Sequence, residues 1–260
     1  MEADPENHVS VNVALYGSGG YRWAMTERGK SQLTRNRDNL VIGPSNLAWR
    51  EDGCLEITFD EICVPIPRRI RGRIVVEPVI TNATPFEIDA LGRHVWQPLA
   101  PLARVTVERD SGKRWHGHAY IDHNRGTEPL TNAFHSWSWS RTFERDRTRI
   151  FYDTKPRRGA GLSLGLCFQG GRLSPLECDT QLQPYRNSAW QLPLEARSDN
   201  GTNARHIETW EDGPFYARNL IEHQIAGLNV KSVHEVVSLH RFDMTIVQAM
   251  LPFRMPRRRG

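Results

Sequence analysis

Residues 161–180 have the sequence GLSLGLCFQGGRLSPLECDT. Their first half alternates leucine and other apolar residues with small or polar ones, as a half-buried strand does. Gly170 and Gly171 can adopt the positive φ angles that a tight hairpin turn requires, and a second extended segment follows. This stretch therefore predicts a β-hairpin.

The same period-two pattern recurs along the chain, with turn residues between the segments. Apolar stripes at helical spacing are scarce, and we expect short helices only near 129–134 and 244–251. Many short strands separated by turns predict a mainly β protein built as an antiparallel barrel or sandwich. The predicted strands include residues 55–67, 72–80, 103–110, 148–154, 161–168 and 232–242.

The composition excludes several classes of protein. In 260 residues no apolar run approaches the ~20 residues that span a bilayer. The acidic, polar start MEADPENH is unlike a signal or transit peptide. We therefore expect a cytoplasmic protein, with any membrane contact peripheral and at the inner face of the cytoplasmic membrane.

The four cysteines show no CxxC spacing. In a chain without a secretion signal they are expected to be reduced and mostly buried, and no structural zinc site is expected. They are Cys54, Cys63, Cys167 and Cys178.

The net charge of +4 is concentrated in arginine clusters. The tail 254–260, RMPRRRG, holds four arginines and no acid, so the remaining 30 basic and 30 acidic residues balance. Such clusters attract anionic lipid or nucleic acid, although a solvated loop explains each alone. No zinc finger, helix-turn-helix or RNP motif is present, so nucleic acid is not an expected partner. The arginines of the two clusters are Arg68, Arg69, Arg71 and Arg73, and Arg254, Arg257, Arg258 and Arg259.

Residues 114–141, RWHGHAYIDHNRGTEPLTNAFHSWSWSR, contain the densest group of chemically active side chains. If 114–122 is a strand, alternation puts two imidazoles, a phenol and a carboxylate on one face. A histidine and a tryptophan share a face in RHVWQP upstream, and two tryptophans do so downstream. These residues are His116, His118, Tyr120 and Asp122; His94 and Trp96; and Trp137 and Trp139.

Three interpretations of this segment stay open. His-x-His with a carboxylate is half of a zinc or iron site, but strands often carry His-x-His without metal. Alternatively the residues are structural, with Asp122 capping a turn at DHNRG. In the third, a carboxylate among aromatic rings has its neutral form favoured and acts as a general acid.

The segment GHAYIDHNRGTEPL followed by FHSWSWSR resembles the carotenoid 1,2-hydratase (hydroxyneurosporene synthase) family. The resemblance runs in order along the whole chain, through IGPSNLAWREDG, VPIPRRIRGRI, FEIDALGRHVWQPLAP, EDGPFYARN, VHEVVSLHRF and MLPFRMPRR. One departure is His118, where the family usually has glycine.

The resemblance implies two lipocalin-like antiparallel β-barrel or sandwich domains. We expect them at 1–155, with the active site, and at 156–260, with the basic tail. Family members carry a leading segment rich in glycine and aromatics, which the resemblance predicts to be missing here, leaving the first barrel incomplete.

The resemblance also implies a hydro-lyase that needs no cofactor or metal and adds water to the terminal C1=C2 bond of an acyclic carotene of the lycopene or neurosporene type. Asp122 matches the family's catalytic acid, with Tyr120 hydrogen-bonded beside it. Trp96 is expected to offer its π face to the carbocation and His94 to act as general base. The expected pocket lining is His116, His118, Trp137 and Trp139.

Two rival functions stay open: an isomerase or cyclase acting on another isoprenoid or polyketide, and an inactive lipid-binding module. Because carotenes dissolve in membranes, the arginine clusters are also expected to bring the protein to anionic lipid.

Overall fold

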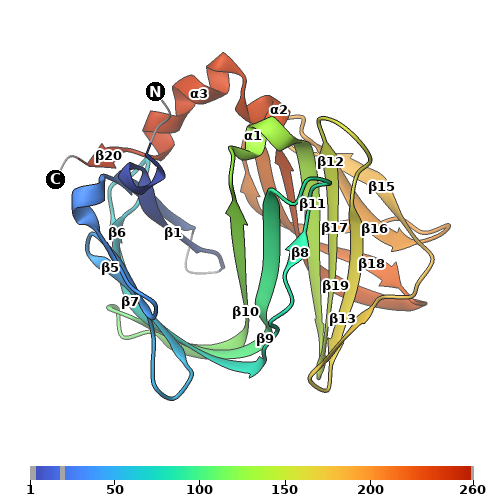
Figure 1. Ribbon diagram of the computed structural model, residues 1–260, viewed down its shortest axis with the longest axis horizontal. Helices are drawn as coiled ribbons and strands as arrows, with labels where there is room; N and C mark the ends of the chain where they lie inside the picture. The colour runs from blue at the N-terminus through green and yellow to red at the C-terminus, as the bar shows by residue number, and fades with distance from the viewer. Residues whose placement is uncertain (1–3, 18–20, 259–260) are drawn as a thin grey trace. The chain divides into compact units, whose positions relative to one another are not determined.

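The computed structural model describes residues 4–17 and 21–258 and consists mainly of antiparallel β-strands (Figure 1). The mainly β fold class expected from the alternation is confirmed. Contacts divide the chain into two compact units: Met1–Val79, Ala103–Ala119 and Ala249–Gly260 form unit 1, and Ile80–Leu102 and Tyr120–Gln248 form unit 2. The boundary expected at 155/156 falls inside unit 2, and the domains 1–155 and 156–260 stay a prediction.

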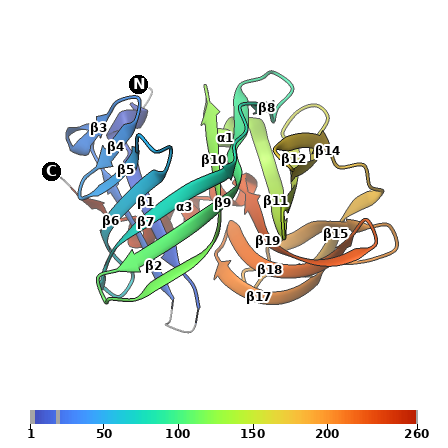
Figure 2. The same cartoon turned by 90° about the horizontal axis from the view of Figure 1, so that it is seen from below.

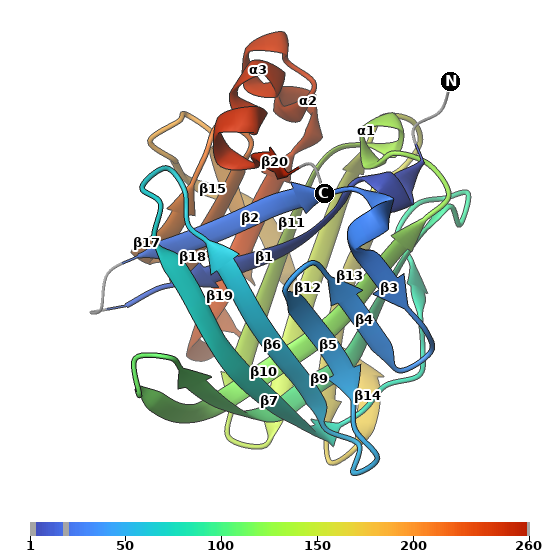
Figure 3. The ribbon, with the colours of Figure 1, turned by 90° about the vertical axis from the view of Figure 1, so that its left-hand side faces the viewer.

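Unit 1 holds a curved run of antiparallel strands (Figure 3). The run continues into β9 (His94–Arg109) and β10 (Arg114–Gly126), whose residues are shared between the two units. A smaller sheet joins β1 (Val9–Leu15) to β2 (Arg22–Arg28), with β20 (Arg257–Arg258) parallel to β2. The curved run consists of β3 (Leu33–Arg35), β4 (Asn39–Ile42), β5 (Ser45–Trp49), β6 (Leu55–Ile62) and β7 (Arg69–Ile80), and single turns of 3₁₀ helix lie at Pro5–Asn7 and Lys30–Gln32.

A buried ion pair joins β2 to β6 within unit 1. Arg28 Nη2 donates to Glu61 Oε2 at 2.7 Å, and both side chains are almost fully buried. Ser45 donates to the other carboxylate oxygen at 2.7 Å. Gly43, at φ 57°, leaves the room that Arg28 needs, because a Cβ there would lie 2.4 Å from Arg28 Nε.

Breaking this pair should destabilise the protein strongly. Glu61→Ala leaves the Arg28 guanidinium buried without its counter-charge, and we expect a loss of about 3–5 kcal/mol in the free energy of unfolding, measured by urea titration at neutral pH. The matched control is Glu222→Ala, which breaks the exposed pair with Arg205 and should change the midpoint far less. Equal effects of the two variants would contradict the importance of the buried pair.

Unit 2 is built on a seven-stranded antiparallel sheet, with a two-stranded sheet of β15 (Thr180–Asn187) and β16 (Pro193–Asp199) (Figure 2). The short β8 (Phe86–Glu87) pairs with β9. Helices α1 (Leu130–Ala133) and α2 (Leu239–Phe242) flank strand ends, and α3 (Thr245–Arg254) follows. In spatial order the seven strands are β14 (Arg172–Pro175), β13 (Ser163–Gln169), β12 (Arg147–Pro156), β11 (Phe134–Glu144), β19 (Leu228–Ser238), β18 (Tyr216–Ile225) and β17 (Arg205–Asp212).

The predicted hairpin is confirmed: Gln169 pairs with Arg172, and Gly170 and Gly171 have φ angles of 57° and 74°. Both predicted helices are also present, as α1 and α3.

Other predictions were wrong in detail. The strand expected to 242 ends at Ser238, whose hydroxyl caps α2 by accepting from the Arg241 N–H. The strand expected to 67 ends at Ile62. DHNRG is not a turn but the end of β10. Among the free cysteines only Cys63 is buried, and the other three are half-buried.

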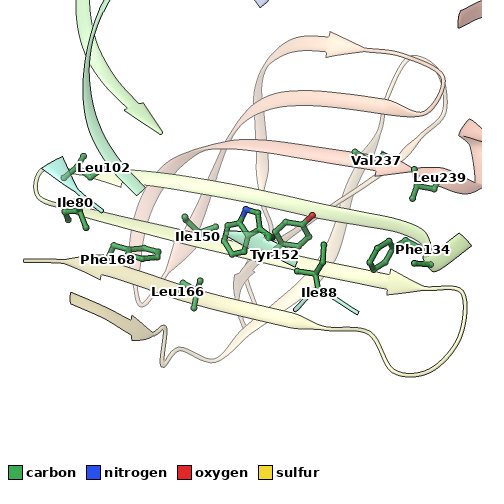
Figure 4. Packing of buried hydrophobic residues seen from close by; sticks show 12 residues of the cluster. Ile80, Ile88, Leu102, Phe134, Ile150, Tyr152, Leu166, Phe168, Val237 and Leu239 are labelled. Carbon is green, nitrogen blue, oxygen red and sulfur yellow. The ribbon is translucent and has the colours of Figure 1, made fainter. Parts of the chain in front are cut away.

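The main hydrophobic core of unit 2 lies on one face of the seven-stranded sheet (Figure 4). Ile150 and Tyr152 of β12 and Leu166 and Phe168 of β13 point from this face. Trp96 of β9 is fully buried in the same cluster. Burial of these large side chains stabilises the unit, and it also fixes the position of the strand that carries Trp96.

Candidate active site

Asp122 of β10 is held by two donors from the aromatic cluster. The indole Nε1–H of Trp96 donates to Asp122 Oδ2 at 2.9 Å, and the Tyr120 hydroxyl donates to the same oxygen at 3.2 Å. The structure therefore brings together three of the predicted residues, from β9 and from alternate positions of β10. Because both donors bind Oδ2, Oδ1 is the oxygen left to carry a proton.

The carboxylate of Asp122 is both crowded and accessible. The residue is exposed to solvent, yet protein surrounds its carboxylate. This burial raises the pKa of Asp122, against the hydrogen bonds from Trp96 and Tyr120, which lower it. The balance of these effects favours the neutral form of Asp122 more than in a fully solvated aspartate, although part of the residue remains exposed to solvent.

The two donors are themselves fixed by aromatic packing. The Trp96 ring lies 5.6 Å from that of Phe86 and 5.1 Å from that of Tyr152. The Tyr120 ring lies 5.3 Å from Trp139, and the Arg141 guanidinium stacks on it at 5.3 Å. Because Trp96 is 0% exposed, the group that it presents to Asp122 is its N–H, and the half-buried rings of Tyr120 and Trp139 are the more accessible π surfaces.

Burial also controls the neighbouring ionisable groups. It raises the pKa of the Tyr120 phenol well above its usual value, and the charge of Asp122 raises it further. Burial raises the pKa of Tyr152 in the same way. It lowers the pKa of Arg141 to about 10, so this guanidinium stays charged at neutral pH while both phenols stay protonated.

His94 lies two residues before Trp96, buried beside other partners. Its ring packs edge-on against Phe134 at 5.1 Å, and its Nε2 lies 3.6 Å from Glu128 Oε1. Gly126 makes room for the ring, since a Cβ there would lie 2.5 Å from His94 Nδ1. No hydrogen bond joins His94 to Asp122, whose donors are Trp96 and Tyr120. The general-base role expected for His94 stays a prediction.

The other predicted lining residues divide into two groups. Trp137 and Trp139 are half-buried on β11 and pack against the main core of unit 2. His116 and His118 are exposed on the part of β10 that belongs to unit 1, where His116 Nδ1 lies 2.9 Å from the Thr106 hydroxyl. No group of three or more His, Cys, Asp or Glu side chains in the described part of the chain is arranged to hold a metal ion.

Four residues near the site were not predicted from the sequence: Tyr152, Arg141, Glu128 and Glu235. Tyr152 and Glu235 lie in predicted strands, within TRIFYDT and SVHEVVSLHRF. Alternation assigns each side chain to one face of its strand but does not show which residue lies opposite it on the neighbouring strand. Glu235 lies among valines at alternate positions, 233 and 237, and an acid in such a row is the signal that could have revealed it.

Replacing Trp96 should change the acid without removing it. Trp96→Phe removes the indole N–H that stabilises the ionised form, so the pKa of Asp122 should rise further. Tyr120→Phe should shift it the same way by less, since its bond is longer. A ¹³C NMR titration of the aspartate carboxyls, assigned with Asp122→Asn, measures both shifts, and an unchanged pKa in Trp96→Phe would contradict the described hydrogen bond.

Comparisons with known proteins place this chain in a family. Residues 2–260 match the family model described as carotenoid hydratase CrtC, and the chain belongs to that family. A crystal structure described as a putative AttH from Nitrosomonas europaea has a similar fold, with a TM-score of 0.61, 10% identity, and coverage of 85% of this chain and 78% of that one. The lipocalin-like β architecture is supported by this likeness.

Three relatives share one name. An acyclic carotenoid 1,2-hydratase of Thiocapsa roseopersicina is 46% identical over 98% of this chain, and one of Rubrivivax gelatinosus is 43% identical over 98%. The chain spans 63% of the length of each of these two relatives. A third, of Cereibacter sphaeroides, is 36% identical, with 99% of this chain and 92% of its own length covered.

Proposed function

We propose that this protein hydrates the terminal C1=C2 bond of an acyclic carotene by acid catalysis, as the names of its relatives suggest. The observation that carries the proposal is the Asp122 carboxyl, with both donors on Oδ2 and a raised pKa among aromatic rings. An isolated alkene is a weak base, so its protonation needs an acid whose neutral form is favoured.

In this mechanism Asp122 delivers its proton from Oδ1. The π electron pair of the alkene forms the new C–H bond at C2, and a tertiary cation remains at C1. Trp96 and Tyr120 meanwhile bind the carboxylate that forms at Oδ2, so their hydrogen bonds strengthen as charge develops. A water oxygen then forms the C–O bond at C1, and the proton that it loses is returned to the Asp122 carboxylate through a base or solvent, so the net change is the addition of one water molecule.

The cation requires a surface that stabilises charge without trapping it. Aromatic faces do so, each by roughly 0.5–2 kcal/mol. The half-buried Trp139 and Tyr120 suit this role better than Trp96, whose ring is covered by Phe86 and Tyr152. For His94 we propose a positioning role, because its ring packs between Phe134 and Glu128 at the start of the strand that carries Trp96.

Asp122→Asn tests the acid directly. The amide cannot donate a proton as an acid does, so hydration should fall by about 10²–10⁴-fold. Chromatography and mass analysis of pigments from a lycopene- or neurosporene-producing host measure it, with Glu222→Gln, which breaks the exposed pair with Arg205, as a control that should hydrate as the wild type does. Unreduced hydration by Asp122→Asn would overturn the role of Asp122, and a rearranged or unaltered carotene with the wild type would favour an isomerase, a cyclase or a binding protein.

We also propose that the protein meets its substrate at an anionic membrane surface. No helix in the described part of the chain is long and apolar enough to cross a bilayer. Helix α3 exposes Ile246 by 64% and Phe253 by 80%, and residues 244–258 contain three arginines and no acid. An exposed apolar stripe beside cations is typical of a helix that lies in the membrane interface.

Most described arginines of the two clusters pair with acidic side chains, which reduces their attraction to an anionic membrane. Arg69 binds Asp60, Arg73 binds Glu56, and Arg257 binds Glu27. Arg71 lies 3.9 Å from Asp60. Arg68 and Arg258 make no ion pair with a described residue, and Arg259 lies outside the described residues.

The membrane proposal predicts a local effect of α3. The double variant Ile246→Ser, Phe253→Ser should bind vesicles of phosphatidylglycerol and phosphatidylcholine at least about tenfold more weakly, because two large apolar side chains no longer enter the lipid. Leu228→Ser removes a 52% exposed leucine elsewhere and should leave binding unchanged. Co-sedimentation measures this, and equal binding by all three proteins would contradict a docking role for α3.

A further inference from the structure

A row of side chains crosses the seven-stranded sheet of unit 2 at the level of the candidate site. In strand register, Trp139 of β11 pairs with Tyr152 of β12 on one side and with Glu235 of β19 on the other. Glu235 in turn pairs with Arg218 of β18. Directly opposed residues point to the same face of a sheet, so Glu235 shares the face that carries Tyr152 and Trp139.

Glu235 is an acid on a largely apolar face. It is half-buried, and it lies between Val233 and Val237 at alternate positions of β19. Arg218 Nε donates to its Oε1 at 2.9 Å. Burial and the charge of Asp122 raise the pKa of Glu235, whereas Arg218 and a hydrogen bond with Tyr216 lower it.

The same row connects Glu235 to Asp122. Tyr152 packs on Trp96, and Trp139 packs on Tyr120, so the two donors to Asp122 rest on this part of the sheet. Glu235 is the next residue in the row beyond Trp139. The charge of Asp122 is among the causes that raise the pKa of Glu235, so the two carboxyl groups lie within electrostatic range of each other.

The indole N–H of Trp139 is buried and has no acceptor among the described residues. An unsatisfied buried donor costs roughly 1–3 kcal/mol, and such groups are found where a ligand or water binds. A donor at Trp139 and a carboxylate at Glu235, on paired residues, suit a water molecule that must be both held and deprotonated.

We propose that Glu235, held by Arg218, is a second catalytic carboxylate of this site and takes the proton of the attacking water. The proposal rests on the hydration proposed above. Asp122 gives its proton to C2, the water oxygen bonds to C1, and one water proton passes to the Glu235 carboxylate. Return of that proton from Glu235 to Asp122 restores both groups, so the net change is the addition of one water molecule.

The rate of hydration should fall at both low and high pH. Glu235 must be ionised, so the rate should fall as pH drops through its pKa; Asp122 must be protonated, so the rate should fall as pH rises through its own. The groups facing the pair are Tyr216, Arg218, Tyr152, Trp96, Tyr120 and His123, and the two limbs of the profile belong to the pair as a whole.

Glu235→Gln tests the proposal. The isosteric amide should lower kcat by about 10²-fold or more, with a smaller change in KM, and should remove the acidic limb of the profile. Glu235→Asp should keep that limb and part of the rate. The matched control Glu222→Gln breaks the exposed pair with Arg205 and should behave as the wild type. Wild-type kcat and an unchanged acidic limb in Glu235→Gln would overturn the base role.

A second measurement needs no turnover and separates this proposal from the proposed activity. Because a nearby negative charge disfavours ionisation, Glu235→Gln should lower the pKa of Asp122 in a ¹³C NMR titration, while Glu222→Gln should not. An unchanged pKa would show that the two acids do not form one site. If the wild type hydrates no carotene but the shift appears, the paired carboxyls stand and the assigned reaction fails.

Discussion

The hydrogen bond from Trp96 to Asp122 joins the hydrophobic core of unit 2 to the candidate acid. Trp96 is fully buried between Phe86 and Tyr152, so its N–H has a fixed direction, and the carboxylate must meet it at Oδ2. Core packing thereby positions an acid that remains open to solvent. A scaffold of this kind costs little reorganisation when charge develops on the carboxylate, which is what acid catalysis on a weakly basic alkene requires.

Electrostatics in this protein is mostly local. The net charge of +4 suggested basic surfaces, but many arginines are paired with acids across neighbouring strands, as Arg69 is with Asp60 and Arg218 with Glu235. On α3, the exposed apolar side chains of Ile246 and Phe253 are a more distinctive feature than the nearby arginines. Inside unit 2 the important quantity is desolvation, which raises the pKa values of Asp122, Tyr120 and Glu235 together.

Sequence patterns predicted the features that depend on residues close together in the chain. Alternation predicted the strands and the shared face of Tyr120 and Asp122, and the Gly170-Gly171 pair predicted its hairpin. Alternation cannot say which strands pair, so the row of Tyr152, Trp139 and Glu235 was not foreseen. Nor can it say which atom a side chain presents: Trp96 was expected to offer a π face, whereas packing covers that face and turns its N–H to Asp122.

If the raised pKa of Asp122 governs the proposed hydration, the pH dependence of the reaction and the titration of this carboxyl must agree. The alkaline limb of kcat/KM against pH for the wild-type protein with a linear carotene should have the same apparent pKa as the Asp122 carboxyl measured by ¹³C NMR in the free protein, because kcat/KM reports the free enzyme. Agreement between the two values is the predicted result. Full activity at pH values where the NMR titration shows Asp122 ionised would contradict the account.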